Sequence, residues 1–261
     1  MKLITKEQTF KEGFARIRLI IFGPGGVGKT TLAYSFNDDP RTAPVLGIDF
    51  AGNPERIVAG LNAPIILRLE KPDDLDLVVD FFRAGQPLKH ELRKVADIAS
   101  DLVFKTVVFD TFSEWQRGVI DRITGNEHIK QISNAISPEA IAHGGKIFSV
   151  SMKAARDFLL ALDVNVILVM QEQEKTPLTG EPIQLQPFLY GQARKQISTH
   201  ATLQGRLERI SGEKGGTDVQ VWWDEPSFKS HVKNQTGAPL GRRMVNPTAT
   251  KIIDILTKVS N

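Results

Sequence analysis

The sequence contains no cysteine, so disulfide bonds and thiolate-ligated metal sites are excluded. Its five histidines do not have the spacing of a zinc site. No apolar run approaches the roughly 18 to 20 residues that a membrane-spanning helix needs, and residues 1–14 are too polar for a signal peptide. Neither sign of charge predominates, since 33 Lys and Arg residues and 30 Asp and Glu residues give a net charge of only +3. These absences favour a soluble cytoplasmic protein with no membrane partner.

What the chain does have is enough apolar material for one large core. It is 261 residues long and 41% hydrophobic, which suits one domain with a small appendage. We expect residues 1–15 to form a lead-in and residues 16–235 to form the core domain. Residues 236–261 are then a C-terminal tail that ends in a helix.

The most informative stretch is a glycine-rich loop between an apolar run and a helical stretch. Residues 17–22 form a run that is apolar apart from Arg18, and Gly23–Thr30 matches the P-loop pattern G-x-x-x-x-G-K-[ST] without a mismatch. A helix is expected from Lys29. Glycines free the backbone to point N–H groups at phosphate oxygens, and the helix start adds its positive dipole. Lys29 offers a charge to the β- and γ-phosphates, while the Thr30 hydroxyl can bind Mg²⁺. The predicted nucleotide-binding residues are Gly23, Pro24, Gly25, Gly26, Val27, Gly28, Lys29, Thr30 and Thr31.

Short apolar runs alternate with stretches of helical spacing after this loop. The predicted strands are 45–50, 65–69, 104–110 and 164–170, and the predicted helices are 73–82, 89–102 and 148–162. Such alternation indicates βαβ units and a mostly parallel sheet. Asp110 closes the third of these strands, at the sheet edge where open α/β sheets bind ligands. We therefore predict that Asp110 helps to hold Mg²⁺ beside the P-loop.

The pattern changes after residue 171. Residues 172–190 carry three prolines and read as a long hairpin or loop at the ligand edge. A helix at 193–199 is followed by strands at 201–210, 217–223 and 227–232, an irregular stretch at 237–247, and a final helix at 248–259. Trp222 and Trp223 alternate across a predicted strand, so at least one of them is expected in the core.

This order of parts resembles the RecA-like recombinase core. The resemblance rests on the P-loop, the strands that end in Asp49, Asp110 and Gln171, and the later antiparallel strands. It is strongest to small phage-encoded ATPases that act as single-strand annealing proteins, and to phage and bacterial AAA-family ATP-binding proteins. It implies an α/β P-loop NTPase fold: a mostly parallel sheet flanked by helices, with antiparallel strands toward the C-terminus. It also implies ATP and Mg²⁺ as cofactors, single-stranded DNA as a partner, a homo-oligomer (ring or filament), and the host cytoplasm for a phage-encoded protein.

The resemblance assigns roles to individual residues. Asp110 matches the Mg²⁺-associated aspartate of the family, and Gln171 matches the glutamine that senses the γ-phosphate and begins the loop that contacts DNA. Within that loop, Lys175 could contact a phosphate. Phe188 and Tyr190 could stack on bases or pack the hairpin onto the core.

A second assignment concerns a neighbouring subunit. Residues 231–234 resemble a family segment whose lysines reach the nucleotide of the next subunit. Lys233 matches the first of these lysines, while Gln235 stands where the second would be. A role in trans is therefore predicted for Lys233 only.

One departure from the family concerns the residue that activates water. The family has a glutamate just after the aspartate of the second strand, and here Asp49 is followed by Phe50 and then Ala51. Glu55 is the residue predicted to substitute as a catalytic group alongside Lys29, Asp110 and Gln171, and Glu114 is a further candidate. ATP hydrolysis is therefore expected to be slow if neither glutamate reaches the water.

Other functions of a P-loop protein stay open at this point. A helicase loader, a packaging motor or a partition-type switch shares the P-loop, although partition proteins have an early lysine in the region that Pro24 occupies here. A small-molecule kinase fits the antiparallel C-terminal strands less well, although Arg242 and Arg243 could bind an anion. An ATP-responsive assembly protein with little turnover is compatible with Ala51.

Overall fold

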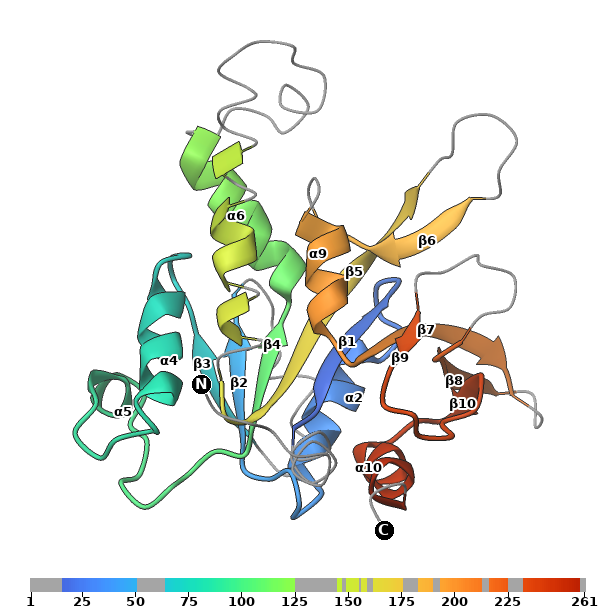
Figure 1. Cartoon of the computed structure of the whole chain (residues 1–261), viewed down its shortest axis with the longest axis horizontal. Helices are drawn as coiled ribbons and strands as arrows, with labels where there is room; N and C mark the ends of the chain where they lie inside the picture. The colour runs from blue at the N-terminus through green and yellow to red at the C-terminus, as the bar shows by residue number, and fades with distance from the viewer. Residues whose placement is uncertain are drawn as a thin grey trace, which may run out of the picture.

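The computed structural model describes residues 16–50, 64–124, 145–146, 149–154, 156–158, 162–175, 183–189, 193–212, 216–224 and 232–258. Within these ranges the strands form one ten-stranded sheet (Figure 1). The strands are β1 (Arg18–Gly23), β2 (Val45–Asp49), β3 (Ile65–Arg68), β4 (Thr106–Asp110), β5 (Asn165–Lys175), β6 (Gln184–Pro187), β7 (Leu203–Ser211), β8 (Thr217–Trp222), β9 (Lys233–Asn234) and β10 (Arg243–Val245). The helices are α2 (Lys29–Tyr34), α4 (Asp74–Arg83), α5 (Glu91–Val95), α6 (Phe112–Thr124), α9 (Ala193–His200) and α10 (Ala249–Lys258), and η1 (Ser35–Asn37) is a 3₁₀ turn.

The strand order of the sheet is β10-β8-β7-β1-β5-β4-β2-β3. The strands from β7 to β3 in this order are parallel to their neighbours, whereas β8 and β10 are antiparallel additions at one edge. β6 pairs antiparallel with the outer half of β5, and β9 with the start of β7. This is the predicted fold class, a mostly parallel sheet flanked by helices with antiparallel strands toward the C-terminus.

The P-loop strand β1 is fully buried because the sheet is covered on both faces. Ile20 and Phe22 point into a cluster that also holds the apolar faces of α4 and α6. Leu19 and Ile21 point into a second cluster, with α2 and α10. All four side chains are 0% exposed. A strand buried on both faces has a continuous apolar sequence instead of an alternating one, which is why residues 17–22 read as a single run.

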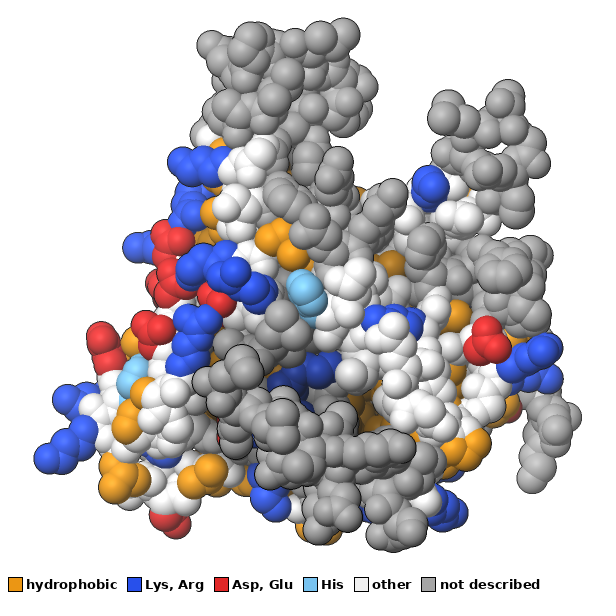
Figure 2. Space-filling view, viewed as in Figure 1, with side chains coloured by type: hydrophobic (Ala, Val, Ile, Leu, Met, Phe, Trp, Pro, Cys, Tyr) orange, Lys and Arg blue, Asp and Glu red, His pale blue; other side chains and the backbone are white. Residues whose placement is uncertain are grey.

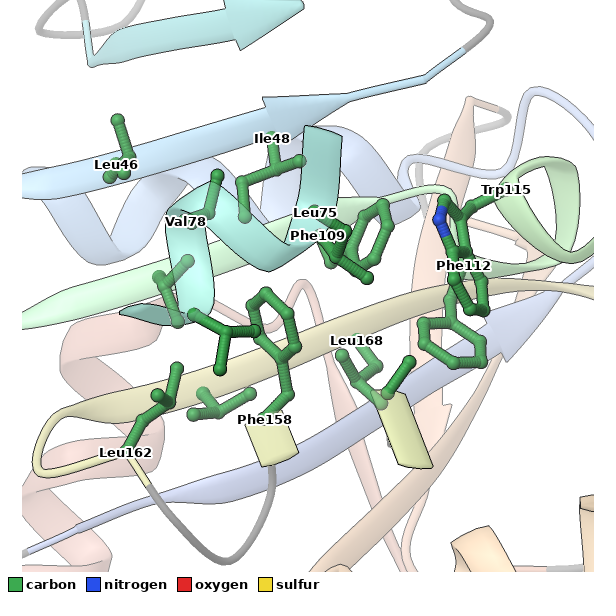
Figure 3. Packing of buried hydrophobic residues seen from close by; sticks show 14 of the residues in the cluster. Leu46, Ile48, Leu75, Val78, Phe109, Phe112, Trp115, Phe158, Leu162 and Leu168 are labelled. Carbon is green, nitrogen blue, oxygen red and sulfur yellow. The ribbon is translucent and has the colours of Figure 1, made fainter. Parts of the chain in front are cut away.

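Aromatic side chains fill the first cluster next to the ligand edge (Figure 3). Phe109 on β4 packs edge-on against Phe112 at a centroid distance of 5.3 Å, and Phe112 lies 5.0 Å from Trp115 on the same helix. Phe158 approaches Phe109 from the helical segment 156–158. This packing fixes the start of α6 against the end of β4, so the residues just after Asp110 are held firmly.

Ion pairs connect the helices on that face at their solvent side. Arg83 of α4 contacts Asp157 at 2.5 Å, and Lys153 contacts Asp76 of α4 at 3.0 Å. Figure 2 shows Lys and Arg side chains interspersed with Asp and Glu along this side of the molecule. The pair of Lys153 and Asp76 is exposed on both sides and contributes little, whereas the carboxylate of Asp157 is buried beneath Arg83.

Three elements differ from their predicted bounds. Helix α5 ends at Val95 although helical spacing continues to 102, because Asp97 adopts a left-handed conformation (φ 49) and the Ile98 N–H donates to the carbonyl of Arg93. β5 continues to Lys175, beyond the predicted end at 170, because its outer half pairs with β6. The stretch 237–247, predicted to be irregular, contains the short edge strand β10.

The remaining predicted elements from β2 to α10 lie close to their expected bounds where they can be compared. Of the three C-terminal strands that were predicted, 201–210 and 217–223 correspond to β7 and β8. The third, 227–232, lies almost wholly outside the described residues. In the described part of the chain, no helix combines the length and the apolar character that crossing a membrane requires.

Candidate nucleotide-binding site

The P-loop begins where β1 ends, at the carboxyl edge of the sheet. Gly23 adopts φ 153, and a Cβ at this position would lie 2.3 Å from the carbonyl oxygen of Leu207 on β7. Gly26 and Gly28 have φ values of 69 and 99, which side chains with a Cβ rarely adopt. Gly28 is also the N-cap of α2, which begins at Lys29. The sequence therefore uses glycine where the loop turns and where it touches its neighbour.

Lys29 points back into the P-loop. Its Nζ donates to the carbonyl oxygens of Gly23 at 2.8 Å and Pro24 at 2.7 Å. Burial lowers the pKa of Lys29 from its ordinary value, whereas the charges of Asp110 and Glu172 act in the opposite direction. The ammonium group is thus held at the mouth of the loop, with two carboxylates close enough to act on it.

Asp110 ends β4 and lies beside the P-loop helix. It is 6% exposed, and its carboxylate accepts a hydrogen bond from the hydroxyl of Thr30. Burial raises the pKa of Asp110 from 3.8 to about 6; the Thr30 hydrogen bond and Lys29 oppose the rise, and Asp49 adds to it. The structure thus brings Thr30, Lys29 and Asp110 together, as the sequence predicted.

Asp49 occupies the corresponding end of the neighbouring strand. It is the register partner of Asp110 on β2, it is 1% exposed, and it forms an ion pair with Arg68 at 3.2 Å. Two carboxylates therefore end adjacent strands at this edge. Asp49 has a cationic partner at the surface, whereas the partners of Asp110 among the described residues are Thr30 and Lys29 of the P-loop.

Gln171 and Glu114 meet between the P-loop strand β1 and the strand β4 that carries Asp110, since β5 lies between these two strands. Gln171 is the register partner of Gly23, and its Nε2 donates to Glu114 Oε1 at 2.6 Å. Glu114 lies in the first turn of α6, where Thr111 caps the helix by accepting from the Glu114 N–H. Arg117 donates to both carboxylate oxygens of Glu114, at 3.1 and 3.0 Å.

Ser113 ties this pair to the hairpin formed by β5 and β6. Its hydroxyl accepts from the Gln171 N–H at 3.0 Å and donates to the Phe188 carbonyl at 2.8 Å. The Phe188 ring is half-buried, with the Arg117 guanidinium 5.9 Å from its centroid. The start of α6 is therefore bonded to both strands at the base of the hairpin.

Comparison with protein-family models identifies the chain. Residues 15–234 match the model of a family described as "AAA domain", which covers most of the sequence. The chain belongs to this AAA family. No sequence among the curated proteins matches it.

Solved structures similar to this AAA domain include two with low identity. The RadB recombinase is 17% identical, with a TM-score of 0.46 and coverage of 93% of this chain and 94% of that one. The flagellar accessory protein FlaH from Methanocaldococcus jannaschii is 15% identical, with a TM-score of 0.40 and coverage of 88% and 85%. The AAA family and the sheet topology support a RecA-like core that binds ATP.

Lys233 lies away from the P-loop of this AAA domain. Its Nζ donates to three carbonyls at the end of α9, those of Ser198, Thr199 and Ala201, at 2.7 to 3.2 Å. Its charge therefore caps a helix of its own subunit. A contact with the nucleotide of a neighbouring subunit would require these bonds to break, and that role stays a prediction.

Several other predicted residues cannot be placed. Glu55, Ala51 and Tyr190 lie outside the described residues. Lys175 is exposed at the end of β5, so it is available to a partner.

Sequence reasoning missed two arginines on β7. Arg209 donates from Nη2 to the Gly26 carbonyl at 2.5 Å and lines a groove of about 550 Å³ beside the P-loop. Other residues of the groove come from α2, from Val219 on β8 and from residues 246–248. Arg206 lies on the opposite face of β7 and pairs with Glu172. Neither arginine stands in a local motif, since β7 reaches the P-loop only through the pairing of β7 with β1.

Proposed function

We propose that this AAA domain binds and hydrolyses ATP, and that it acts on single-stranded DNA in phage-type recombination or strand annealing. The observation that supports ATP as the ligand is the convergence of Lys29, Thr30 and Asp110 at the end of β1 and β4. In this proposal residues 23–31 surround the phosphates, and Lys29 exchanges its loop carbonyls for phosphate oxygens.

The same residues suit Mg²⁺. The Thr30 hydroxyl and the Asp110 carboxylate are within hydrogen-bond distance of one another, so one cation could contact both oxygens. Oxygen donors are the ligands that Mg²⁺ prefers. When bound, the ion would neutralise phosphate charge.

The groove beside the P-loop is our candidate for the nucleoside. Its lining combines P-loop residues with the apolar side chains of Leu207 and Val219 and the charged Arg209. A cleft that combines apolar side chains with polar groups is typical of small-molecule sites. Arg209 on β7, which donates to the Gly26 carbonyl, is then the residue that contacts the ribose or a phosphate.

For hydrolysis we assign Glu114 as the residue that takes a proton from the attacking water. It touches Gln171, which pairs in register with the first residue of the P-loop. Water oxygen would bond to the γ-phosphorus as the bond to the bridging oxygen of ADP breaks, and the proton of the water would pass to the Glu114 carboxylate. Glu55 stays an alternative base.

The hairpin of β5 and β6 is the candidate DNA-binding element. It extends beyond the sheet from the ligand edge (Figure 1), and its base is bonded to Ser113 and Glu114 through Gln171. The resemblance to annealing ATPases, together with the exposed Lys175, supports this assignment. Assembly into a homo-oligomer belongs to the same proposal.

A second candidate is an ATP-responsive assembly protein with little turnover. It is favoured by the engagement of both Glu114 oxygens by Arg117, with Gln171 also bound to one of them. A carboxylate held in this way must give up a partner before it can accept a proton from water.

The deciding experiment measures ATP turnover by the purified protein with and without single-stranded DNA. We expect turnover that DNA stimulates, and loss of activity in Lys29→Ala. Glu114→Gln should lower turnover at least tenfold while it leaves ATP binding intact, and Glu91→Gln, another first-turn glutamate on a helix, should not. Turnover that ignores DNA, with no DNA binding at low salt, would contradict the recombination role. ATP binding without turnover would favour the second candidate.

A further inference from the structure

A largely buried ion pair connects the two strands that flank β1, beside the first residue of the P-loop. Arg206 Nε donates to Glu172 Oε2 at 2.6 Å, and the two side chains are 11% and 13% exposed. Arg206 lies on β7 and Glu172 on β5, the strands that flank β1 on its two sides. Arg206 pairs in register with Phe22, and Gln171, the residue before Glu172, pairs in register with Gly23. The pair therefore reaches across β1 at the point where the strand becomes the P-loop.

Arg206 is anchored from its other side as well. Its Nη1 donates to Glu208 Oε2 at 2.5 Å, and Glu208 Oε1 accepts from Gln220 at 2.5 Å and from Trp222 at 2.7 Å. Glu208 is thus fixed by β8, away from the P-loop. Glu172 is the carboxylate of this network that acts on Lys29: burial lowers the pKa of Lys29, and the charge of Glu172 opposes that lowering.

Without a ligand, Lys29 is the cation that Glu172 and Asp110 act on at the P-loop. Arg206 offsets part of the charge of Glu172, because it pairs with Glu208 as well. A bound phosphate takes up the charge of Lys29 and leaves Glu172 facing additional negative charge. In a poorly solvated site such a like-charge contact is costly.

We propose that Glu172 is a positioning residue that sets the electrostatic cost of phosphate binding at the P-loop, and that Arg206 limits this cost by pairing with it. The proposal rests on the proposed function, since it takes ATP as the ligand. It assigns a role to two residues outside the P-loop and outside the pair of Gln171 and Glu114.

The position of Glu172 also connects this cost to the hairpin. Glu172 pairs with Pro187 in the first register step between β5 and β6. A partner that draws this part of the hairpin away from the P-loop removes the carboxylate from Lys29, so it strengthens ATP binding. By thermodynamic linkage, ATP then strengthens the binding of that partner by the same factor.

The test uses two substitutions that break the same ion pair with opposite effects on charge. Glu172→Gln should lower the Kd for ATP about fivefold to tenfold at low salt, because it removes a negative charge. Arg206→Gln should raise the Kd by a similar factor, because it leaves Glu172 uncompensated. Glu174→Gln is the matched control: it lies two residues further along β5, it is exposed, and no salt bridge to it is found among the described residues. It should change the Kd less than twofold.

Calorimetry with ATP and Mg²⁺ gives each Kd, and thermal melting checks that each variant is folded. Two single variants that shift the Kd in the same direction would show a merely structural ion pair and overturn the proposal. If either fails to fold, the double variant Glu172→Gln with Arg206→Gln replaces it, with a Kd within about twofold of wild type expected and a larger change contradicting the idea. A wild-type protein that does not bind ATP would instead overturn the proposed function.

Discussion

At Gly23 the backbone of β1 comes closer to β7 than a side chain allows. The Leu207 carbonyl occupies the place of a Cβ, and φ is in a region that residues other than glycine rarely adopt. The position therefore needs glycine for the fold itself, before any ligand binds.

We expect Gly23→Ala to lower the free energy of unfolding by at least about 2 kcal/mol, through steric overlap and backbone strain. Gly25→Ala is the control, because nothing lies within 4 Å of a Cβ there, and it should change stability by less than about 1 kcal/mol. Urea denaturation without nucleotide measures both. Equal effects of the two substitutions would contradict the steric explanation.

The burial of Asp110 lowers the stability of the folded protein at neutral pH. Its pKa is about 6 in the folded protein and 3.8 as an isolated group, so the folded state binds the proton more tightly than the unfolded chain. The free energy of unfolding therefore falls as the pH rises from about 4 to about 6, and the loss persists at higher pH.

Asp110→Asn should remove this penalty. Without nucleotide or Mg²⁺, we expect the variant to be more stable than wild type at pH 7.5 by about 2 to 3 kcal/mol, with the difference disappearing toward pH 4. Chemical denaturation across this pH range measures it. A variant less stable than wild type at neutral pH would show that the carboxylate is needed by the fold.

Among the elements, the connection between α4 and β4 depends on one buried arginine. Arg93 is 5% exposed and donates to four carbonyls, those of Gln86, Pro87, Ala99 and Leu102, at 2.5 to 3.0 Å. Its guanidinium also lies 5.2 Å from the centroid of Phe81. A single side chain thus satisfies the turns on both sides of α5.

Arg93→Lys should therefore destabilise the protein by about 2 to 4 kcal/mol, since an ammonium group cannot reach carbonyls in four directions. Lys94→Arg, at the exposed neighbouring position, should have an effect below about 0.5 kcal/mol. Guanidinium denaturation and amide hydrogen exchange between 86 and 102 provide the measurements. A change in exchange confined to α5, with unaltered global stability, would contradict this explanation.

Elements with local signals were predictable from the sequence, and elements defined by distant pairing were not. The P-loop and Asp110 follow from the residues around them, so Lys29, Thr30 and Asp110 were predicted and meet in the structure. Strand β10 is three residues long, and it exists only because β8 offers an edge. The short helix α5 depends on the left-handed conformation of Asp97 and on the hydrogen bonds that Arg93 donates to four carbonyls.

The approach of Arg206 and Arg209 to the P-loop illustrates the same limit within the site. Both arginines reach the P-loop only because β7 pairs with β1. Arg209 and Gly26, for example, are joined by a hydrogen bond although they are 183 residues apart in the chain. Nothing near them in the sequence resembles a nucleotide-binding pattern. The contact between Glu114 and Gln171 was likewise invisible, although each residue was singled out separately.

For the molecule as a whole, the proposal predicts assembly that depends on both ligands. With a non-hydrolysable ATP analogue and single-stranded DNA, we expect the mass measured by light scattering to rise well above that of one chain. Raising the salt concentration should weaken the assembly on DNA, since phosphate contacts release counterions. Lys29→Ala should fail to assemble under the same conditions. A wild-type protein that stays at the mass of one chain with both ligands would contradict the oligomer.

Because β1 lies between β5 and β7, it can pair with its neighbours only after both of these later strands have been synthesised. β1 leaves the ribosome before both of its neighbours, since Arg18 pairs with Val166 and Leu19 with Leu203. At roughly 5 to 20 residues per second, its neighbours appear on the order of ten seconds later. Until then Leu19 to Phe22, all fully buried in the folded protein, have no sheet to enter. Such a nascent segment is a natural target for chaperones, and slower translation prolongs its exposure.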